Sequence, residues 1–364
     1  MTKHKTIVLA AGGTGGHLYP AEALARELLD RGHRIVIITD KRGNAFRKLG
    51  NEVRIGRVRA ATLKPGLVSK IRAVADIGIG ILQAAVLLTK HKPSLIVGFG
   101  GYPSFPTVFA GQRLGIQTLL HEQNAVLGKA NLWLANGANA IAVSLPETRG
   151  ITPANKVKVT VTGNPVRAGI CAMRDIPYPA LAGTFEIFIT GGSQAAKIFS
   201  DVVPESVRRL PEDVKKRLHI VHQCREGDIA STEEKYRAAG VNAEIKSFFD
   251  DMPERLSACH LFIGRSGAST VAEIAVVGRP AIFVPYPGHA DQQQKHNAGL
   301  IAVKNGGWVM MQDEFTAEKL ADRIEHLAKN PFILENTAKA AKACGQPEAV
   351  RNLADLVEKR FRKE

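Results

Sequence analysis

The sequence predicts an α/β protein with two domains, each built from a parallel sheet wound with helices. Strand-like apolar segments alternate with amphipathic helical patterns along the whole chain, which is typical of this class. A length of 364 residues is enough for two separate hydrophobic cores. Residues 6–32 and 186–211 both read as a strand, a glycine turn and a long helix, so the two halves repeat one supersecondary unit.

Both halves supply a series of strand candidates. In the first half these are residues 6–10, 34–39, 95–98, 117–121, 140–144 and 158–162. In the second half they are residues 186–190, 220–223, 243–247, 261–264, 281–284 and 307–311. The halves are expected to join between Asn164 and Pro165, since a proline disfavours a helical conformation in the residue before it. Substrates are then expected in the cleft between the domains, where the carboxyl ends of the strands face each other.

The positive charge lies almost entirely in one half. The whole chain carries 49 Lys or Arg and 34 Asp or Glu, a formal net charge of +15. Residues 1–165 hold 22 basic and 8 acidic side chains, whereas residues 166–364 hold 27 and 26. A basic half favours a polyanionic partner, either nucleic acid or an anionic membrane face, although a generally basic proteome would give the same excess. With 6% aromatic residues and no recognisable nucleic-acid-binding motif, the sequence argues against nucleic acid.

Cysteine usage and hydropathy favour a reducing cytoplasm. The four cysteines are far apart and form no CxxC pair, which argues against a structural zinc site and a disulfide framework. They are Cys171, Cys224, Cys259 and Cys344. The first residues contain too short an apolar run for a signal peptide and are predicted to form a strand. The most apolar stretch, residues 77–89, is shorter than the roughly 18 residues of a membrane span, so no span is expected.

A glycine-rich turn at residues 12–17 (GGTGGH) follows the first strand and opens a helix. Its backbone N–H groups and the helix dipole are placed to hold an anion. The spacing fits neither a GxGxxG dinucleotide fingerprint nor a Walker loop, and a tight packing turn would explain it equally well. His17, in the first helical turn, is a candidate proton acceptor or, alternatively, a structural cap.

The second half has a corresponding helix start at residues 264–270 (GRSGAST). Small residues, hydroxyls and N–H groups at a helix N-terminus suit a diphosphate. Glu273, about one turn further, is placed to chelate a ribose diol, or is simply an acid favoured by the helix dipole. A shorter glycine turn, residues 191–194 (GGSQ), follows another strand.

Two polar clusters, residues 121–124 (HEQN) and 289–297 (HADQQQKHN), follow apolar strands. Carboxamides suit sugar hydroxyls because each amide offers a donor and an acceptor, although either cluster could be a solvated loop. Asp250 and Asp251 are adjacent and lack a DxD arrangement, so they are expected to cap a helix. No metal site is assigned.

Eight motifs occur together in the order and spacing of one enzyme family. They are GGTGGH (12–17), GGYPSFP (100–106), HEQN (121–124), GNPVR (163–167), GGSQ (191–194), FDDM (249–252), RSGAST (265–270) with Glu273, and DQQQ (291–294). On these motifs the sequence resembles the MurG family of peripheral membrane glycosyltransferases over essentially its whole length. The resemblance implies the GT-B fold, two Rossmann-like domains facing each other across a cleft. Residues 1–164 would form the acceptor and membrane-facing domain, on which a C-terminal helix at about 347–364 packs, and residues 165–346 would bind UDP-GlcNAc.

The resemblance implies inverting transfer of GlcNAc from UDP-GlcNAc to the MurNAc 4-hydroxyl of lipid I, which is undecaprenyl-pyrophosphoryl-MurNAc-pentapeptide. The product would be lipid II for peptidoglycan. It implies a hexosyltransferase on the cytoplasmic face of the inner membrane, touching anionic lipid, with no cofactor, no metal and no nucleic-acid partner. Residues 64–92, an apolar helical stretch with basic ends, would rest on that surface, unless they form an ordinary core-facing helix. A diacylglycerol glucosyltransferase and a UDP-GlcNAc 2-epimerase are the nearest rivals.

The resemblance also assigns roles to individual residues. His17 is expected to be the general base, because an unperturbed imidazole is largely neutral at pH 7, and Glu122 is the rival base or the group that orients His17. Tyr102 joins these two on the acceptor side. The substrate-binding residues on the donor side are Thr14, Gly15, Gly16, Asn124, Arg167, Ser193, Phe249, Ala268, Ser269, Thr270, Val271, Ala272, Glu273, Gln293 and Gln294.

Three departures from the family pattern fall in or near these motifs. Ala195 stands where a glycine is usual, Gln292 stands where an arginine is usual, and one extra residue falls near Gly288. None of them removes a group that the chemistry needs.

Overall fold

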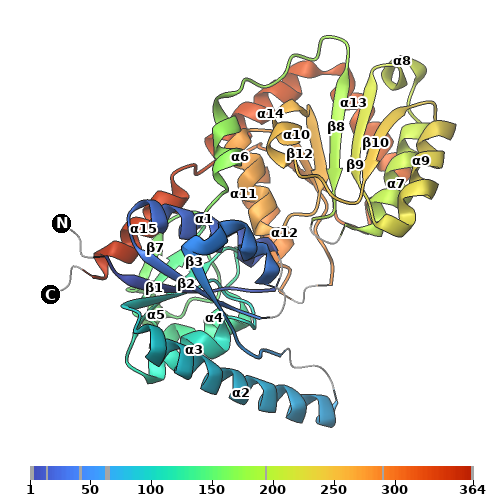
Figure 1. The fold of residues 1–364 in the computed structure, drawn as a ribbon. Helices are drawn as coiled ribbons and strands as arrows, with labels where there is room; N and C mark the ends of the chain where they lie inside the picture. Colours follow the sequence, from blue (N-terminus) through green and yellow to red (C-terminus); the bar gives the residue numbers. More distant parts are fainter. Residues whose placement is uncertain are drawn as a thin grey trace. The chain divides into compact units, whose positions relative to one another are not determined.

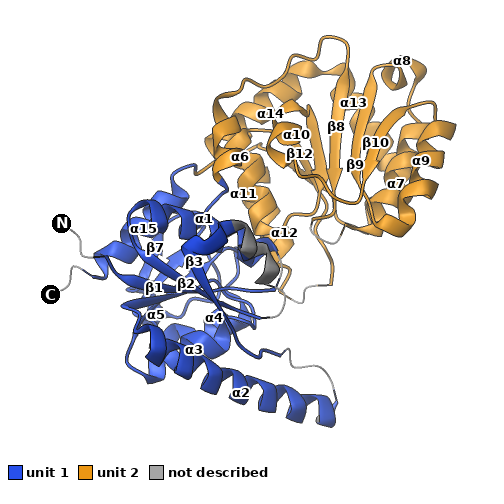
Figure 2. Cartoon of the chain, in the orientation of Figure 1, with its two compact units in different colours: residues 1–167, 347–364 blue, residues 168–346 orange. Residues whose placement is uncertain are grey.

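The chain forms two compact α/β units. The computed structural model describes residues 4–13, 15–40, 43–61, 66–192, 195–288 and 291–361 (Figure 1). Unit 1 comprises residues 1–167 and 347–364, and unit 2 comprises residues 168–346 (Figure 2). The chain therefore passes from one unit to the other after Arg167, whereas the sequence indicated a join after Asn164.

Unit 1 is built on a parallel sheet of seven strands in the order β3-β2-β1-β4-β5-β6-β7. The strands are β1 (Thr6–Ala10), β2 (Arg34–Thr39), β3 (Val53–Arg57), β4 (Leu95–Gly98), β5 (Gln117–Glu122), β6 (Ala140–Val143) and β7 (Val159–Val161). The strand order reverses between β1 and β4, so the loops that follow these two strands diverge and leave room for a ligand at the carboxyl edge.

Helices cover both faces of this sheet. They are α1 (Gly15–Asp30), α2 (Leu67–His91), α3 (Phe105–Arg113), α4 (Lys129–Leu134), α5 (Pro153–Lys156) and α15 (Ala349–Lys359), with 3₁₀ helices η1 (Gly43–Glu52) and η2 (Ala135–Gly137). Alternate residues of each strand supply the two cores: Ile7 and Leu9 pack with α1, η1 and α15, while Val8 and Ala10 pack with α2, α3 and α4.

The last helix, α15, belongs to unit 1 although it follows unit 2 in the sequence. Its apolar face, with Leu353 and Val357 fully buried, packs against α1. At the rim of this contact Arg31 Nη1 lies 2.6 Å from Asp355 Oδ1, and His33 Nε2 lies 3.1 Å from Glu358 Oε1. Two helices more than 300 residues apart thus form one layer on the sheet.

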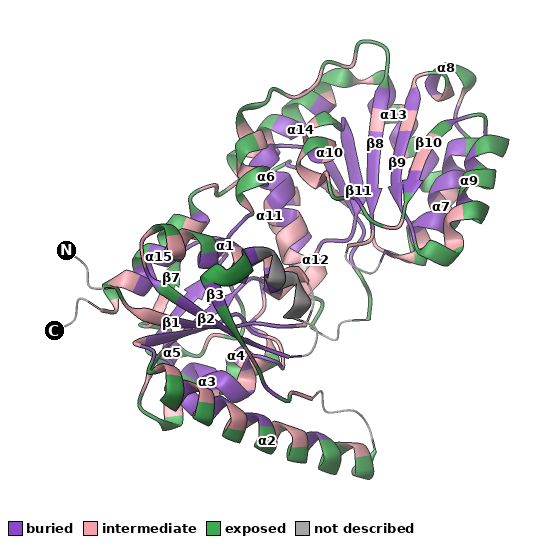
Figure 3. Cartoon of the chain, in the orientation of Figure 1, coloured by how far each residue is buried: buried purple, intermediate pink, exposed green. Residues whose placement is uncertain are grey.

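Helix α2 differs from the other helices of unit 1 because it buries only one narrow face. The segment Val68–His91 is long and apolar enough to cross a membrane, by length and composition. This helix is longer than the apolar run at residues 77–89 that the sequence analysis identified. Ala73, Ala84 and Leu88 are buried, whereas the outward face is exposed and apolar (Figure 3). The exposed large apolar side chains of that outward face are Val68, Ile71, Val74, Ile79, Leu82 and Val86.

Unit 2 has a six-stranded parallel sheet in the order β10-β9-β8-β11-β12-β13. The strands are β8 (Phe185–Thr190), β9 (Leu218–Gln223), β10 (Asn242–Lys246), β11 (Leu261–Gly264), β12 (Ala281–Phe283) and β13 (Trp308–Val309). The helices are α6 (Ala168–Ala172), α7 (Lys197–Arg208), α8 (Glu212–Lys215), α9 (Ile229–Ala238), α10 (Met252–Ala258), α11 (Ala268–Val277), α12 (Gln293–Ala302), α13 (Ala317–Lys329) and α14 (Pro331–Ala343), with η3 (Met173–Asp175) and η4 (Glu226–Asp228).

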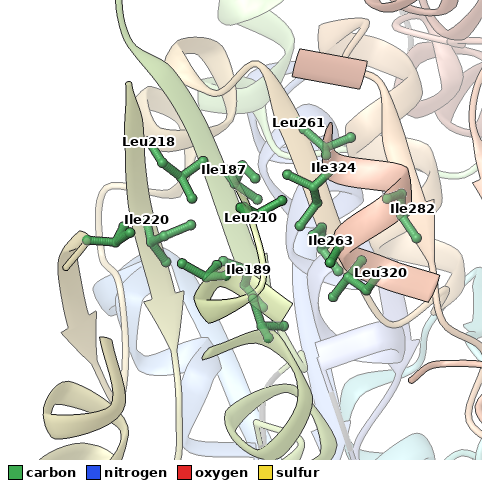
Figure 4. Packing of buried hydrophobic residues seen from close by; sticks show 14 of the residues in the cluster. Ile187, Ile189, Leu210, Leu218, Ile220, Leu261, Ile263, Ile282, Leu320 and Ile324 are labelled. Carbon is green, nitrogen blue, oxygen red and sulfur yellow. The ribbon is translucent and has the colours of Figure 1, made fainter. Parts of the chain in front are cut away.

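In the core of unit 2, as in unit 1, alternate residues of each strand point to opposite faces of the sheet. Ile187, Ile189 and Ile263 point to the face covered by α7, α9 and α13, where they meet Leu320 and Ile324 (Figure 4). On the opposite face, the aromatic rings of β8, β11 and β12 contact each other in sequence. Two parallel sheets wound with helices confirm the predicted α/β fold class.

Candidate active site

The carboxyl edge of the unit 1 sheet brings together loops from β1, β4 and β5. His17 is the third residue of α1, and its Nδ1 lies 2.9 Å from the carbonyl oxygen of Phe99, directly after β4. The same Nδ1 lies 3.2 Å from Oε1 of Gln123, which follows β5. Gly101 makes this approach possible, because a Cβ there would sit 3.1 Å from the His17 ring and its φ is +69°. The structure therefore joins the first glycine turn to the HEQN cluster.

Glu122 is held in a cage of N–H donors. Its side chain is almost fully buried. Oε1 accepts from the backbone N–H of Asn124 at 3.0 Å and from Asn124 Nδ2 at 3.1 Å. Oε2 accepts from the Gly128 N–H and from Asn131 Nδ2, both at 2.9 Å. With two donors on each oxygen, this carboxylate organises the β5–α4 loop and the orientation of the Asn124 amide.

Gln123 and His121 are the residues of this cluster to which the sequence analysis gave no role. Gln123 Nε2 donates to the Phe99 carbonyl at 3.0 Å and lies 3.0 Å from His121 Nδ1. His121 is completely buried, and its Nε2 lies 3.1 Å from the carbonyl oxygen of Gly163. Burial lowers the pKa of His121 to about 4, so the ring is neutral at pH 7. Within the described residues Gln123, rather than Glu122, is the side chain that touches His17.

The remaining unit 1 candidates lie around this edge. Gly15 and Gly16 are the first residues of α1, and Tyr102 is half-buried in the loop after β4. Thr14 lies outside the described residues. The Arg167 guanidinium lies over the ring of Tyr19, 4.4 Å from its centroid, and Arg167 is the last residue of the first segment of unit 1.

The carboxyl edge of the unit 2 sheet carries the second glycine turn and the start of α11. Gly191 packs so closely that a Cβ would lie 2.1 Å from the Ala196 backbone nitrogen. Helix α11 begins at Ala268, and its first N–H groups have no acceptors within the helix, which makes this end a seat for an anion. Ser269, Thr270, Val271 and Ala272 continue this turn, and Glu273 is largely buried on the next. Ser193 lies outside the described residues.

Arg265 fixes the loop beside this helix, a role that the sequence analysis did not assign. Its Nη1 donates to the carbonyls of Val284 and Pro285 at 3.0 and 3.2 Å, and its Nη2 donates to Gln312 at 2.6 Å. Burial lowers the pKa of this guanidinium, and its partners are all neutral oxygens. The sequence did offer a sign of this role, because the arginine of the RSGAST motif directly follows a buried strand.

Helix α12 starts with the two glutamines assigned to the sugar. Gln294 Oε1 accepts from the Tyr286 N–H at 3.0 Å, and the Gln294 carbonyl accepts from Ser266 Oγ at 2.9 Å. The contact with Tyr286 assigns Oε1 as the acceptor and Nε2 as the donor of the Gln294 amide. Gln293 N–H lies 3.4 Å from Asp291 Oδ1.

Phe249 is held by packing, and Asp251 by an ion pair with Arg255. The Phe249 ring is buried edge-on against Phe188, so it is part of the unit 2 core. Asp251 stands at the N-cap position of α10, but its side chain makes no cap hydrogen bond and instead accepts from Arg255 Nε at 2.8 Å, so the expected capping by the side chain is not found. The described ranges contain no group of three or more His, Cys, Asp or Glu residues placed to hold a metal ion.

Comparisons with known proteins agree along the whole chain. Residues 7–143 match the glycosyltransferase family 28 N-terminal domain, and residues 186–356 match the family 28 C-terminal domain. The chain is 52% identical to the UDP-N-acetylglucosamine--N-acetylmuramyl-(pentapeptide) pyrophosphoryl-undecaprenol N-acetylglucosamine transferase of Rhodospirillum centenum, over 96% of this chain and 93% of the relative. It is 45% identical to the transferase of the same name from Paramagnetospirillum magneticum, over 98% of this chain and 97% of that relative.

A comparison with solved structures also points to a MurG enzyme. The crystal structure of Acinetobacter baumannii MurG superposes with a TM-score of 0.78 at 29% identity, covering 98% of this chain and 99% of that one. A putative UDP-N-acetylglucosamine 2-epimerase from Listeria monocytogenes, at 14% identity and a TM-score of 0.69, shares the fold alone. Its low identity contrasts with the 42–52% of the transferases, which separates this chain from the epimerase rival. The chain belongs to glycosyltransferase family 28 and, within it, to the MurG family.

Proposed function

We propose that this enzyme transfers GlcNAc from UDP-GlcNAc to the MurNAc 4-hydroxyl of lipid I with inversion, forming lipid II for peptidoglycan. The observation that carries the proposal is the 52% identity to a transferase of that printed activity over 96% of the chain. The two sheet edges support it, since each places anion-binding N–H groups and amide side chains where ligands meet parallel sheets.

On the acceptor side, His17 is the proposed general base. Its Nδ1 faces the Phe99 carbonyl, which can only accept a hydrogen bond, so Nδ1 carries the proton and Nε2 carries the lone pair. The MurNAc O4 attacks the anomeric carbon on the face opposite UDP. The bond from that carbon to the phosphate oxygen breaks with its electrons passing to UDP, and the O4 proton passes to His17 Nε2. Tyr102 lines the acceptor side.

Glu122 has a positioning role in this proposal. Its four hydrogen bonds from N–H groups occupy both oxygens, so transfer of a substrate proton to it would first have to break one of them. The carboxylate instead orients Asn124, the amide proposed to contact the GlcNAc.

On the donor side, backbone N–H groups stabilise the charge that develops on UDP. Gly15, Gly16, Gly192 and the α11 start at Ala268–Glu273 supply these groups, with Thr14 and Ser193 as further hydroxyl donors. Glu273 is proposed to hold the ribose diol, Arg167 and Phe249 to border the uracil, and Gln293 and Gln294 to bind the sugar hydroxyls. Preorganised donors of this kind usually contribute the largest part of the barrier reduction.

We also propose that unit 1 rests on the cytoplasmic face of the cell membrane. The exposed apolar face of α2 is flanked by Lys70, Arg72, Lys90 and Lys92, all exposed, which suits an anionic lipid surface. Lys64 lies outside the described residues. This partner explains the basic half without nucleic acid.

The test is transfer of labelled GlcNAc to a short-chain lipid I analogue, with UDP-glucose as the control donor. We expect a β-1,4-linked product and stoichiometric UDP, with UDP-glucose at least about tenfold slower because the sugar-binding amides lose a partner. Equal use of UDP-glucose, or conversion of UDP-GlcNAc to its 2-epimer without acceptor, would count against the proposal.

A further inference from the structure

One backbone carbonyl is a shared hydrogen-bond acceptor for two side chains. The Phe99 oxygen accepts from Gln123 Nε2 at 3.0 Å and lies 2.9 Å from His17 Nδ1. A carbonyl oxygen has no proton to give, so both nitrogens must donate to it. His17 is therefore in the Nδ1–H tautomer, and the Gln123 amide points its NH₂ group toward Phe99.

The same amide reaches a second imidazole. The other N–H of Gln123 Nε2 faces His121 Nδ1 at 3.0 Å, so that nitrogen accepts and His121 carries its proton on Nε2, which donates to Gly163. Gln123 Oε1 remains for His17 Nδ1 at 3.2 Å. A rotated amide would place its oxygen against the Phe99 carbonyl and its N–H groups against the His17 proton, so only one arrangement satisfies every contact.

This chain of contacts is well protected from solvent. His121 is fully buried, Gln123 is 2% exposed, and the Phe99 ring tilts against the His121 ring at 5.5 Å. The lowered pKa of His121 keeps its Nδ1 lone pair available at neutral pH. Gln123 and His121 are therefore shielded from bulk water, while His17 is half-buried.

We propose that Gln123, itself held by His121, is a positioning residue that fixes the tautomer and ring orientation of His17, so that Nε2 presents its lone pair to the acceptor hydroxyl. The inference rests on the proposed role of His17 as base. Without Gln123 only the Phe99 carbonyl still holds the ring, so the ring is freer to rotate and to carry its proton on Nε2, a form in which it cannot accept the substrate proton. Because the partner is a neutral amide rather than a carboxylate, it supplies orientation without an ion pair.

The test compares Gln123→Met, which keeps the length of the side chain but removes its hydrogen bonds, with Gln112→Met. Gln112 donates to the Leu134 carbonyl at 2.9 Å in another part of unit 1, so its variant controls for the loss of a partly buried, hydrogen-bonded amide. We expect Gln123→Met to lower kcat about 10- to 100-fold while KM for UDP-GlcNAc changes less than about twofold. Gln112→Met should leave kcat near the wild-type value.

Nitrogen NMR of ¹⁵N-histidine-labelled enzyme reads the proton position directly. The His17 signals, assigned with His17→Gln, should show a single Nδ1–H tautomer in the wild type and in Gln112→Met, but not in Gln123→Met. A wild-type ring protonated on Nε2, an unchanged tautomer in Gln123→Met, or an unchanged kcat in that variant would each overturn the proposal.

Two variants of His121 distinguish its contact with Gln123, made by Nδ1, from its contact with Gly163, made by Nε2. An Asn side chain places an acceptor near the Nδ1 position, whereas a Gln side chain places a donor near the Nε2 position. His121→Asn should therefore keep the His17 tautomer and more of kcat than His121→Gln, per folded molecule; the reverse order would contradict the inference. The NMR measurement needs no substrate, so an inactive wild type would count against the proposed function, whereas an unchanged tautomer counts against Gln123 alone.

Discussion

Asn131 in α4 donates its Nδ2 to Glu122 Oε2 at 2.9 Å and to the His121 carbonyl at 3.2 Å, so one side chain ties the end of β5 to the helix that follows. Glu122 is the centre of this arrangement, since the four hydrogen bonds to its carboxylate all come from N–H donors of the same loop and helix. A carboxylate used in this way stabilises the loop rather than the reaction.

Replacing Glu122 by Gln should therefore mainly affect stability. The new NH₂ group would face two N–H donors, and we expect the free energy of unfolding to fall by about 1–3 kcal/mol. His17→Ala should change stability by less than about 1 kcal/mol but lower kcat by about 10²- to 10⁴-fold. Urea unfolding measures the free energy of unfolding of each variant, and steady-state kinetics measures its kcat. A Glu122→Gln enzyme as stable as the wild type but as slow as His17→Ala would identify Glu122 as the base.

The outward face of α2 should determine membrane binding. Leu82 and Val86 are 70% and 69% exposed, so Leu82→Ser with Val86→Ser should leave the fold intact while lowering the affinity for anionic vesicles about tenfold. Val157→Ser, at a position 90% exposed elsewhere on unit 1, is the control and should bind as the wild type does. Co-sedimentation at two salt concentrations tests the basic residues as well. Equal vesicle binding by all three proteins would contradict a role for α2.

Unit 2 should lose stability in acid through His222. This ring is fully buried, its Nδ1 lies 2.8 Å from the Tyr236 hydroxyl, and burial lowers its pKa to about 3. Between about pH 6.5 and 3 the unfolded chain binds a proton at this position and the folded chain does not, so the free energy of unfolding falls as the pH falls. Above pH 7 both states are neutral and the contribution is constant.

His222→Gln removes this titration and should make the pH dependence of unfolding shallower by up to about 1.4 kcal/mol per pH unit in that window. Thermal unfolding of the wild type and of His222→Gln, measured from pH 7 to pH 4, checks this difference in pH dependence. His326→Gln, on the exposed side of α13, is the matched loss of one histidine. A pH dependence equal to the wild type in His222→Gln would show that other groups set the acid stability.

Ala195 should be a source of strain. Its φ is +47°, in the left-handed region that a Cβ disfavours, and this is the position where the family usually has a glycine. Ala195→Gly should therefore raise the free energy of unfolding by about 0.5–1 kcal/mol, because relief of strain outweighs the added freedom of the unfolded chain.

The neighbouring Ala196 has φ −129° and is the matched control, since Ala196→Gly adds freedom without relieving strain. It should destabilise unit 2 by about 0.5–1 kcal/mol. Urea unfolding of both variants gives the comparison, and a stabilising Ala196→Gly would contradict the explanation.

Sequence patterns predicted most of the fold because buried parallel strands such as β6 and β11 are continuous apolar runs. They missed β3, an edge strand whose Arg54, Gly56 and Arg57 break such a run. Motif spacing also predicted His17 and the HEQN cluster as site candidates, and the structure places them in contact. It could not assign Gln123, because its contact with His17 joins residues 106 positions apart and depends on which amide atom faces a carbonyl.

Helix α15 packs on unit 1 but is synthesised after unit 2, and this affects the order in which the two units can fold. The ribosome completes residues 168–346 before it makes Ala349–Lys359, so the α1 side of the first sheet waits without its last helix while the second sheet is already able to fold. During that interval the surface destined for Leu353 and Val357 is open to chaperones and to neighbouring nascent chains. The N-terminal unit is therefore the last to be finished, although it emerges first.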